Sequence, residues 1–305
     1  MSRLLACRAA SIRNARLLLA MLLLAAVLGS AGCALYVGLV PAPAAPSLPT
    51  ATKLKVHFID VGQGDAVLIQ CTPGGAALID AGPGAYAEDL VRYLTEQGVE
   101  SIDLIIATHP HEDHIGGLPA VFAAFEVRLV VDAGVSHTTR AYRLYSESLD
   151  SKIRQLESQH QTPKGQVIRL AANVAVTILG PPQPMETLND SSVVSRLDFG
   201  ATSFLFMGDA LYAAEADLIK RGAPLQTDVL KVSRHGSSTT TSRQFADAVS
   251  PTYAVITVGA DNPYGHPTKQ TLSRLTEVGA VILRTDLHGT IVFESDGARL
   301  HLRAP

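Results

Sequence analysis

Apolar runs and amphipathic stretches alternate along the chain from residue 54 onward. Runs typical of buried strands cover residues 54–60, 65–70, 76–80, 102–107, 127–132, 167–179, 228–232 and 254–258, and another ends just before Gly208. Helical periodicity covers residues 86–97, 118–125 and 138–160, with a further helix beginning near Leu211. Strands, helices and a second set of strands predict an α/β (α+β) fold, a four-layer αββα sandwich whose strand ends converge at one edge.

The first 53 residues differ from this body in composition. Residues 1–16 are basic, and residues 17–40 contain no charged side chain, which is the layout of a secretory signal or an N-terminal membrane anchor. A helix of that length would be about 36 Å long at ~1.5 Å per residue, enough to cross a bilayer. Residues 41–53 form a proline- and alanine-rich linker. We therefore expect a signal or anchor at 1–40, a linker at 41–53 and a folded domain at 54–305.

Residues 30–33, Ser-Ala-Gly-Cys, resemble a bacterial lipoprotein processing site, with Ser30 where leucine is usual. Three alternatives remain open: a lipid anchor on Cys33, an uncleaved membrane segment, and a cleaved, secreted form. All three predict an extracytoplasmic body, and the first two anchor it to the cell envelope. The membrane is thus an expected partner, whereas the sequence indicates no protein partner.

Composition and charge narrow the classes of function. The chain has 305 residues and 47% hydrophobic content, ample for a large folded domain. Its formal charge is −3, but without the four arginines of the first 33 residues the rest carries 21 basic against 28 acidic side chains, a charge of −7. An acidic body argues against salt-driven binding of nucleic acid over a wide surface. Aromatic residues make up 5% with no tryptophan, so stacking platforms are expected to be scarce.

Most of the side chains that could bind a metal lie in the loop between the strand at 102–107 and the helix at 118–125. This loop reads Thr-His-Pro-His-Glu-Asp-His and contains His109, His111, Asp113 and His114. Two histidines spaced by two on an extended backbone point to the same side, and the last two side chains can face back across the turn. Such a set suits zinc, or manganese and iron where oxygen ligands join. A surface turn would rarely gather three of the ten histidines.

The H-x-H-x-D-H pattern after an apolar strand resembles the metallo-β-lactamase superfamily of binuclear metallohydrolases. The phrases F-I-D-V-G-Q-G-D-A at 58–66 and L-I-D-A-G at 78–82 narrow the resemblance to the hydrolase domain of ComEC-type DNA-uptake competence proteins. The match runs from about residue 54 to the C-terminus. It implies a metallo-β-lactamase-like sandwich with two divalent metal ions, zinc or manganese.

The resemblance also implies the ligands of these ions. They are His109 and His111 for one ion, Asp113, His114 and His235 for the other, and Asp209 of a G-D-A turn between the two. Two such ions activate a water molecule for attack on an ester at neutral pH. Asp113 and Asp209 would act in catalysis, together with His266 of an N-x-Y-G-H-P segment as proton donor or substrate contact. Without the resemblance, Asp209 would be interpreted as a helix cap.

The superfamily usually has one more histidine shortly before the bridging aspartate. Residues 180–208 contain no histidine, so Asn189 or Ser192 of an N-x-x-S-x-V segment would substitute as an oxygen ligand and favour manganese over zinc. His137 and His160 could also serve as third ligands, but we expect both at the surface. We expect the same of His57, His288 and His301.

Several residues are expected to support the ligands or to contact substrate. Asp80 ends its strand where it can bond a ligating histidine, or else cap the helix at 86–97. Arg234 replaces the first histidine of the family's H-H-G-S loop and offers a cation for a substrate phosphate. The resemblance further implies supporting or substrate contacts for Lys231, Ser237, Asn262 and Tyr264.

These features predict an extracytoplasmic metal-dependent hydrolase, in the first place a phosphodiesterase or DNase. Its expected partner is a phosphodiester substrate, including DNA. One alternative is a hydrolase of small esters, of the phosphocholine ester or lactone type. Another is a non-catalytic metal-binding surface module, which the missing histidine supports. β-Lactamase activity is not expected, because the fold does not specify the reaction and the loop motifs resemble the competence group.

Overall fold

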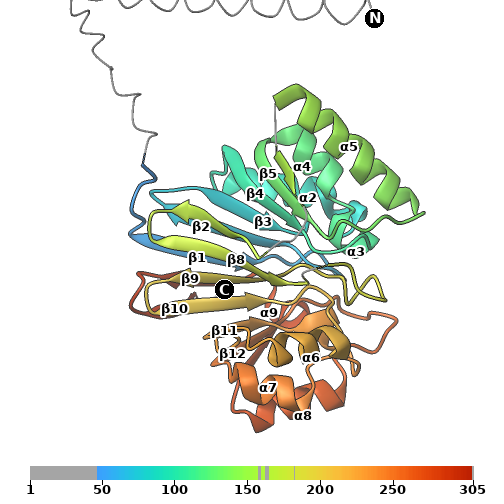
Figure 1. Ribbon diagram of the computed structural model, residues 1–305, viewed down its shortest axis with the longest axis vertical. Helices are drawn as coiled ribbons and strands as arrows, with labels where there is room; N and C mark the ends of the chain where they lie inside the picture. The colour runs from blue at the N-terminus through green and yellow to red at the C-terminus, as the bar shows by residue number, and fades with distance from the viewer. Residues whose placement is uncertain (1–46, 157–158, 162–164, 182, 304–305) are drawn as a thin grey trace, which may run out of the picture. The chain divides into compact units, whose positions relative to one another are not determined.

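Two β-sheets lie face to face in the computed structural model, and helices cover the outer face of each sheet (Figure 1). The structure describes residues 47–156, 159–161, 165–181 and 183–303. This arrangement confirms the predicted four-layer αββα sandwich. The predicted signal or anchor, Cys33 and residues 41–46 of the linker lie outside the described residues. Among those that are described, no helix combines the length and the apolar content needed to cross a membrane.

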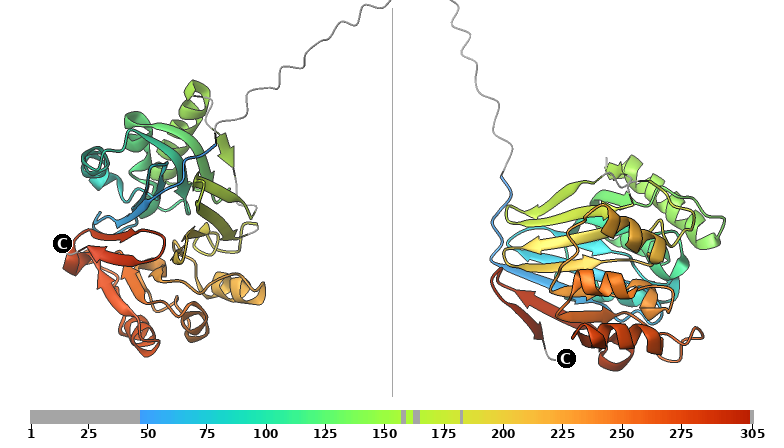
Figure 2. Two further views of the ribbon diagram at one scale, coloured as in Figure 1. Left: turned by 90° about the vertical axis from the view of Figure 1, so that its left-hand side faces the viewer. Right: turned by 60° about the horizontal axis from the view of Figure 1, so that its bottom comes forward.

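The first sheet joins the two ends of the described chain. Its order is β15 (Leu300–Arg303), β14 (Ile291–Ser295), β1 (Lys53–Phe58), β2 (Val67–Thr72), β3 (Ala76–Ile79), β4 (Ser101–Ala107), β5 (Glu126–Asp132) and β6 (Gln159–Gln161). β14 pairs with β1 in antiparallel register, so the C-terminal strands, red in Figure 2, lie beside the blue N-terminal strand. From β3 to β6 the strands run parallel.

The second sheet is formed by the seven consecutive strands β7 to β13 from the middle of the described chain. Its order is β13 (Val281–Arg284), β12 (Tyr253–Ile256), β11 (Val229–Lys231), β10 (Thr202–Phe206), β9 (Val194–Phe199), β8 (Val174–Gly180) and β7 (Val167–Ala171). β10 to β13 are parallel, whereas β7 to β10 form antiparallel pairs.

Apolar side chains explain why the layers stack. Aromatic rings from both sheets meet between them: Phe58 of β1 lies 6.2 Å from Phe206 of β10, and Phe293 of β14 lies 6.1 Å from Phe204, measured between ring centroids. All four rings are buried, and each contributes roughly 1.5–3 kcal/mol of hydrophobic stabilisation. The central strand β4 is apolar on both faces because one face meets the other sheet and the opposite face meets helices.

The outer faces carry the longer helices. The first sheet is covered by α2 (Ala87–Glu96), α4 (Leu118–Ala124) and α5 (Arg140–Leu156), and the second by α6 (Tyr212–Lys220), α7 (Arg243–Val249) and α8 (Lys269–Glu277). Shorter turns of helix lie in the connections. They are η2 (Gly84–Tyr86), α3 (Glu112–Ile115), η3 (Ser233–Gly236) and α9 (Thr285–His288).

The prediction of one helix over residues 138–160 is wrong in its last part. Helix α5 ends at Leu156, and Gln159–Gln161 forms the short edge strand β6, parallel to β5. Main-chain hydrogen bonds with the edge of β5 decide the conformation here, and such bonds leave no trace in the local periodicity. His160 therefore belongs to a strand.

Candidate metal centre

The parallel strands of both sheets end at one edge, and the loops that follow them carry the candidate ligands. Strand β4 ends at Ala107, and the next residues turn into the short helix α3, which the sequence analysis did not anticipate. His109 lies in this loop, His111 is the N-cap of α3, and Asp113 and His114 lie within it. From the second sheet, Asp209 follows β10 and His235 follows β11. The structure thus brings all six expected metal ligands to one place.

One group of ligands combines the loop histidines with Asp209. The ligand atoms of His109, His111 and Asp209 all lie within 4.8 Å of one another. Nε2 of His109 is 2.9 Å from Nδ1 of His111 and 3.8 Å from Oδ2 of Asp209. Two nitrogens and one carboxylate oxygen at these separations can surround a single divalent ion.

A second group contains Asp113, His114 and His235, again within 4.8 Å. Oδ2 of Asp113 is 3.2 Å from Nε2 of His235. The other oxygen of Asp209, Oδ1, faces this group, 3.3 Å from Nε2 of His114 and 3.7 Å from Nε2 of His235. Because its two oxygens face different groups, Asp209 occupies the position expected of a bridging ligand.

Buried atoms without partners indicate that this site fits a metal. Nε2 of His114 and Oδ1 of Asp209 are buried and have no hydrogen-bond partner within the described part of the chain. Burying such groups unpaired is costly, and native structures nearly always satisfy them. A divalent cation between them would satisfy both, and the mixed nitrogen and oxygen donors suit zinc or manganese.

Asp80 supports His114 from the side away from the cavity. Its Oδ2 lies 2.7 Å from Nδ1 of His114, and its carboxylate accepts hydrogen bonds of 2.7 Å from the backbone N–H and the hydroxyl of Thr108. Helix α2 has Tyr86 as its N-cap, with no side-chain cap. Of the two expected roles of Asp80, the structure therefore shows the bond to a ligating histidine.

Asp65 is the main residue that the sequence analysis missed. It is buried beneath the second group, 3.4 Å from Nδ1 of His235, and it pairs with the buried Lys231 and accepts a hydrogen bond from the hydroxyl of Thr257. The G-Q-G-D phrase contained it, but nothing local showed which residues it would meet. Lys231 is 2% exposed, so it supports Asp65 and does not reach a substrate.

Burial and the neighbouring carboxylates together set the pKa values of the histidines in the site. Burial lowers the pKa of His109 well below 6.5, which leaves a neutral imidazole suited to bind a metal. Burial acts in the same direction on His114, but Asp209 and three other carboxylates outweigh it and raise its pKa well above 6.5. Asp209, Asp113 and Asp65 likewise outweigh burial at His235 and raise its pKa to about 9. Without metal, protons on these two histidines balance the carboxylates, and a bound dication would replace those protons.

Contacts in the loop before Asp209 distinguish between Asn189 and Ser192, the two candidates for a third ligand. The hydroxyl of Ser192 accepts a hydrogen bond of 3.1 Å from the backbone N–H of Asp209, so it holds the loop. Oδ1 of Asn189 is buried and has no hydrogen-bond partner among the described residues, and Asn189 lines the same cavity as four of the candidate ligands. Its neighbour Asp190 caps α6 by accepting hydrogen bonds from the N–H groups of Leu211 and Ala214.

The loop after β11 positions His235 and Arg234. Both residues have left-handed backbones, with φ of 53° and 46°, a conformation that costs non-glycine residues about 1–3 kcal/mol each. Nδ1 of His235 donates to the carbonyl of Thr257 at 2.8 Å, which points Nε2 toward Asp113. Arg234 turns instead to the cavity. Ser237 is buried and bonds Thr239, so it supports the loop.

Four of the six candidate ligands, His111, Asp113, Asp209 and His235, line a cavity of about 580 Å³. It is lined by Gln63, His111, Glu112, Asp113, Thr139, Asn189, Asp209, Arg234, His235, Pro263, Tyr264 and His266. Arg234, Tyr264 and His266 thus lie where a substrate would contact them. Asn262 has a structural role, because its amide bonds the backbone of Gly259 and of His266.

The remaining histidines lie apart from the candidate ligands or at their margin. His137 is half-buried, with its ring centroid 5.8 Å from that of His111. His288 and His301 are exposed, as expected. The side chain of His160 lies outside the described parts of the chain. The prediction for His57 is wrong: it is buried in β1, where its Nδ1 bonds the hydroxyl of Tyr93 at 2.8 Å.

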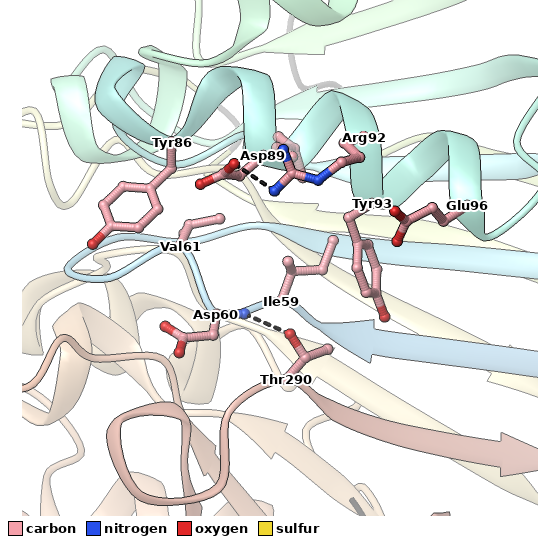
Figure 3. Close-up of a pocket in the computed structure, with 10 residues that line it drawn as sticks. Ile59, Asp60, Val61, Tyr86, Asp89, Arg92, Tyr93, Glu96 and Thr290 are labelled. Atoms are coloured by element: carbon pink, nitrogen blue, oxygen red, sulfur yellow. Dashed lines mark hydrogen bonds and ion pairs between the residues drawn. The ribbon is translucent and has the colours of Figure 1, made fainter.

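A smaller cavity of about 230 Å³ lies between α2 and the loop after β1 (Figure 3). Its charged groups include Arg92 and Asp89, which pair with each other at 2.6 Å. The backbone N–H of Asp60 donates to the hydroxyl of Thr290 at 3.0 Å. These groups satisfy one another, and none of the metal-ligand groups found among the described residues lies here.

Comparison with known proteins agrees with this geometry. A family model described as "Metallo-beta-lactamase superfamily" matches residues 59–259. The ComE operon protein 3 of Bacillus subtilis (strain 168) is 29% identical over 263 residues, which cover 78% of this chain and 33% of that protein. The competence protein ComA of Neisseria gonorrhoeae is 32% identical over 252 residues, covering 81% and 33%. The chain spans about a third of the length of these relatives.

A solved structure shows the same fold at low sequence identity. The CmlA beta-hydroxylase E377D mutant superposes with a TM-score of 0.50 at 15% identity, covering 80% of this chain and 54% of that one. At this identity, the similarity supports the fold alone.

Proposed function

The chain belongs to the metallo-beta-lactamase superfamily, and from this membership and the geometry of its site we propose that it is a phosphodiesterase that uses two metal ions. The observation that carries the proposal is the position of Asp209, whose two carboxylate oxygens face two separate groups of ligands. A mononuclear site would not need a buried carboxylate shared in this way. The similarity to competence proteins and the DNA-uptake resemblance favour DNA as the substrate.

The candidate ligands would be distributed over two metal ions. His109 and His111 would hold one ion and Asp113, His114 and His235 the other, with Asp209 shared and Asn189 adding an oxygen ligand to the first. Two divalent ions supply a water of lowered pKa and stabilise charge on the phosphoryl oxygens.

Arg234 and His266, which line the cavity, would position the phosphodiester. Arg234 is the one lysine or arginine that lines the cavity among the described residues, and its planar guanidinium can bind two phosphate oxygens. His266 lines the same cavity, and its buried Nδ1 has no hydrogen-bond partner in the part of the chain that the structure describes. It can hold a proton at the oxygen that leaves when the P–O bond breaks.

The experiment that tests the proposal is hydrolysis of bis(p-nitrophenyl) phosphate and of linear DNA. The purified chain is stripped of metal and then supplied with zinc or manganese. We expect metal-dependent cleavage of both substrates, with turnover reduced about 10³-fold or more in Asp209→Asn and His109→Ala. Full activity of Asp209→Asn would contradict the two-metal mechanism.

A second candidate is hydrolysis of small esters, such as phosphocholine esters or lactones. It is favoured by the single arginine and by the limited volume of the cavity, about 580 Å³, which is the size of a small-molecule site. Cleavage of the small ester without cleavage of DNA would support this candidate. Binding of two metal ions without any hydrolysis would support a non-catalytic surface module.

We also propose that the protein works outside the cytoplasm, anchored to the cell envelope. The support is the uncharged segment at 17–40 behind a basic N-terminus, with Cys33 inside it. If Cys33 carries lipid, wild type incorporates labelled fatty acid and partitions with membranes, and Cys33→Ala does neither. Membrane association that persists in Cys33→Ala would indicate the uncleaved segment.

A further inference from the structure

Tyr264 is placed at the rim of the metal centre although aromatic residues are scarce in this chain. Its side chain is 66% exposed, and among the described residues it is the one phenylalanine or tyrosine that lines the cavity. The floor of the same cavity contains Asp209, which is 4% exposed. A ligand that reaches from the floor to the rim therefore meets first the metal centre and then an open aromatic ring.

Hydrogen bonds of Asn262 hold the loop that carries Tyr264. Oδ1 of Asn262 accepts hydrogen bonds from the N–H groups of Tyr264 and His266, at 3.2 and 3.0 Å. Its Nδ2 donates to the carbonyls of Gly259 and His266, at 3.1 and 2.7 Å. One amide thus connects both sides of the loop, which lowers the entropy lost when a ligand binds there.

The ring itself is held on one face and open on the other. The rings of Tyr264 and His266 stack with centroids 5.7 Å apart and planes at 25°. Contact with His266 fixes the orientation of the tyrosine ring, and its large exposed fraction shows that solvent reaches the rest. A flat, pre-oriented aromatic face of this kind binds planar groups by stacking.

The polar residues of the cavity indicate what the planar group is attached to. Arg234 lines the same cavity and is half-buried. Its Nη1 donates to the hydroxyl of Thr239 at 3.2 Å, which leaves other N–H groups of the guanidinium for a phosphate. In a nucleotide, a phosphate is joined through a sugar to a base. The guanidinium of Arg234 would suit the phosphate, and the ring of Tyr264 would suit the base.

We propose that Tyr264 stacks on a nucleobase next to the scissile phosphodiester, so that the site selects unpaired nucleotides. This inference rests on the proposed phosphodiesterase function. In a duplex, both faces of a base are covered by its neighbours, and freeing one costs a few kcal/mol. A single strand or a strand end offers the base without that cost, and it does not need the wide cationic surface that duplex binding requires.

The test compares one dinucleotide with and without its bases. The substrates are d(ApA) and an analogue in which hydrogen replaces both bases, and the metal-loaded full chain is compared with Tyr264→Ala and Tyr264→Phe. We expect Tyr264→Ala to lose about tenfold or more in kcat/KM on d(ApA) relative to its loss on the abasic analogue. Tyr264→Phe keeps the ring and should behave like wild type. A single-stranded oligonucleotide should be cut faster than the same sequence in a duplex.

Three results would overturn the inference while leaving the phosphodiesterase intact. The first is an equal loss of kcat/KM on d(ApA) and on the abasic analogue in Tyr264→Ala. The second is a loss of kcat/KM in Tyr264→Phe as large as that in Tyr264→Ala. The third is an equal rate of cleavage of duplex and single-stranded DNA. If wild type cleaves no phosphodiester, the proposed function fails instead. In that case, calorimetric binding of AMP and of ribose 5-phosphate tests whether Tyr264 stacks on a base, because it needs no turnover. We expect Tyr264→Ala to weaken the binding of AMP and not that of ribose 5-phosphate. Unchanged AMP binding would refute the stacking.

Discussion

Single side chains that never face the cavity control the geometry of the ligands. Asp80 is fully buried, and its carboxylate binds both the ring of His114 and the backbone of Thr108. It therefore fixes which nitrogen of His114 is free for a metal and where that nitrogen points. Beneath His235, the buried Asp65 lies 3.4 Å from Nδ1 and pairs with Lys231.

We predict that Asp80→Ala weakens metal binding about 10- to 100-fold, because His114 loses the acceptor that orients it. The measurement is competition with a chelator of known affinity. Asp217→Ala is the control, since it also removes a carboxylate but one that pairs with Arg221 on the exposed side of α6. Equal affinities of Asp80→Ala and the control would exclude an orienting role for Asp80.

His57 should make the fold sensitive to acid. Burial lowers its pKa from 6.5 to about 4, so between these two values the unfolded chain binds a proton that the folded chain does not. The free energy of unfolding therefore falls as the pH is lowered through this window, by roughly 2–4 kcal/mol from this residue alone. Urea denaturation of metal-free wild type and His57→Gln at pH 7.5, 6 and 4.5 measures the difference. If both proteins lose stability in parallel, His57 does not titrate in this way.

Elements meet at the metal centre through backbone contacts that leave no room for side chains. Gly64, between β1 and β2, packs directly on the short helix α3: a Cβ added there would lie 2.4 Å from the carbonyl oxygen of Asp113. The next residue, Asp65, donates its N–H to that same oxygen at 3.1 Å. The turn between the first two strands therefore holds the helix that carries Asp113 and His114.

We predict that Gly64→Ala lowers the free energy of unfolding by about 2–4 kcal/mol and also weakens metal binding, because α3 must move. Gly98→Ala is a matched control: Gly98 also has a positive φ, of 76°, but a Cβ there meets nothing within 4 Å. It should cost about 1 kcal/mol and leave metal affinity unchanged. Similar effects of the two substitutions would show that the contact with α3 is unimportant.

At the scale of the whole molecule, the metal centre joins the two sheets. His109, His111, Asp113 and His114 follow a strand of the first sheet, whereas Asp209 and His235 follow strands of the second. Between the sheets the apolar core already holds the layers together. At the edge, several carboxylates are buried close together, and without a cation their charge is offset only by protons on His114 and His235.

We therefore predict that metal stabilises the entire fold. At a free metal concentration of 100 Kd, binding adds about 2.7 kcal/mol, which raises Tm by roughly 5–10 °C for a domain of this size. Thermal unfolding of loaded and chelator-stripped protein measures the shift, and His235→Ala should lose most of it. The same Tm with and without metal would mean that the ligands do not form a site in solution.

Features that depend on residues close together in the chain could be predicted from the amino-acid sequence. Four ligands fall within six positions, from His109 to His114, so a strand-to-turn connection is enough to bring them together. The apolar runs predicted most strands, since burial between a sheet and a layer of helices leaves a continuous apolar pattern. Together with the family motifs, these local patterns predicted the αββα sandwich and the ligand set.

Features that depend on contacts between distant segments became visible in the folded chain alone. The tertiary structure placed Asp65 against Lys231 and His235, distinguished Asn189 from Ser192, buried His57 and turned Gln159–Gln161 into an edge strand. Each of these outcomes follows from how strands pair and how layers pack, and the residues involved are separated along the chain by tens to hundreds of positions. Hydrophobic patterning is a local signal, whereas the partner of a buried charge is chosen by the packing of the whole fold.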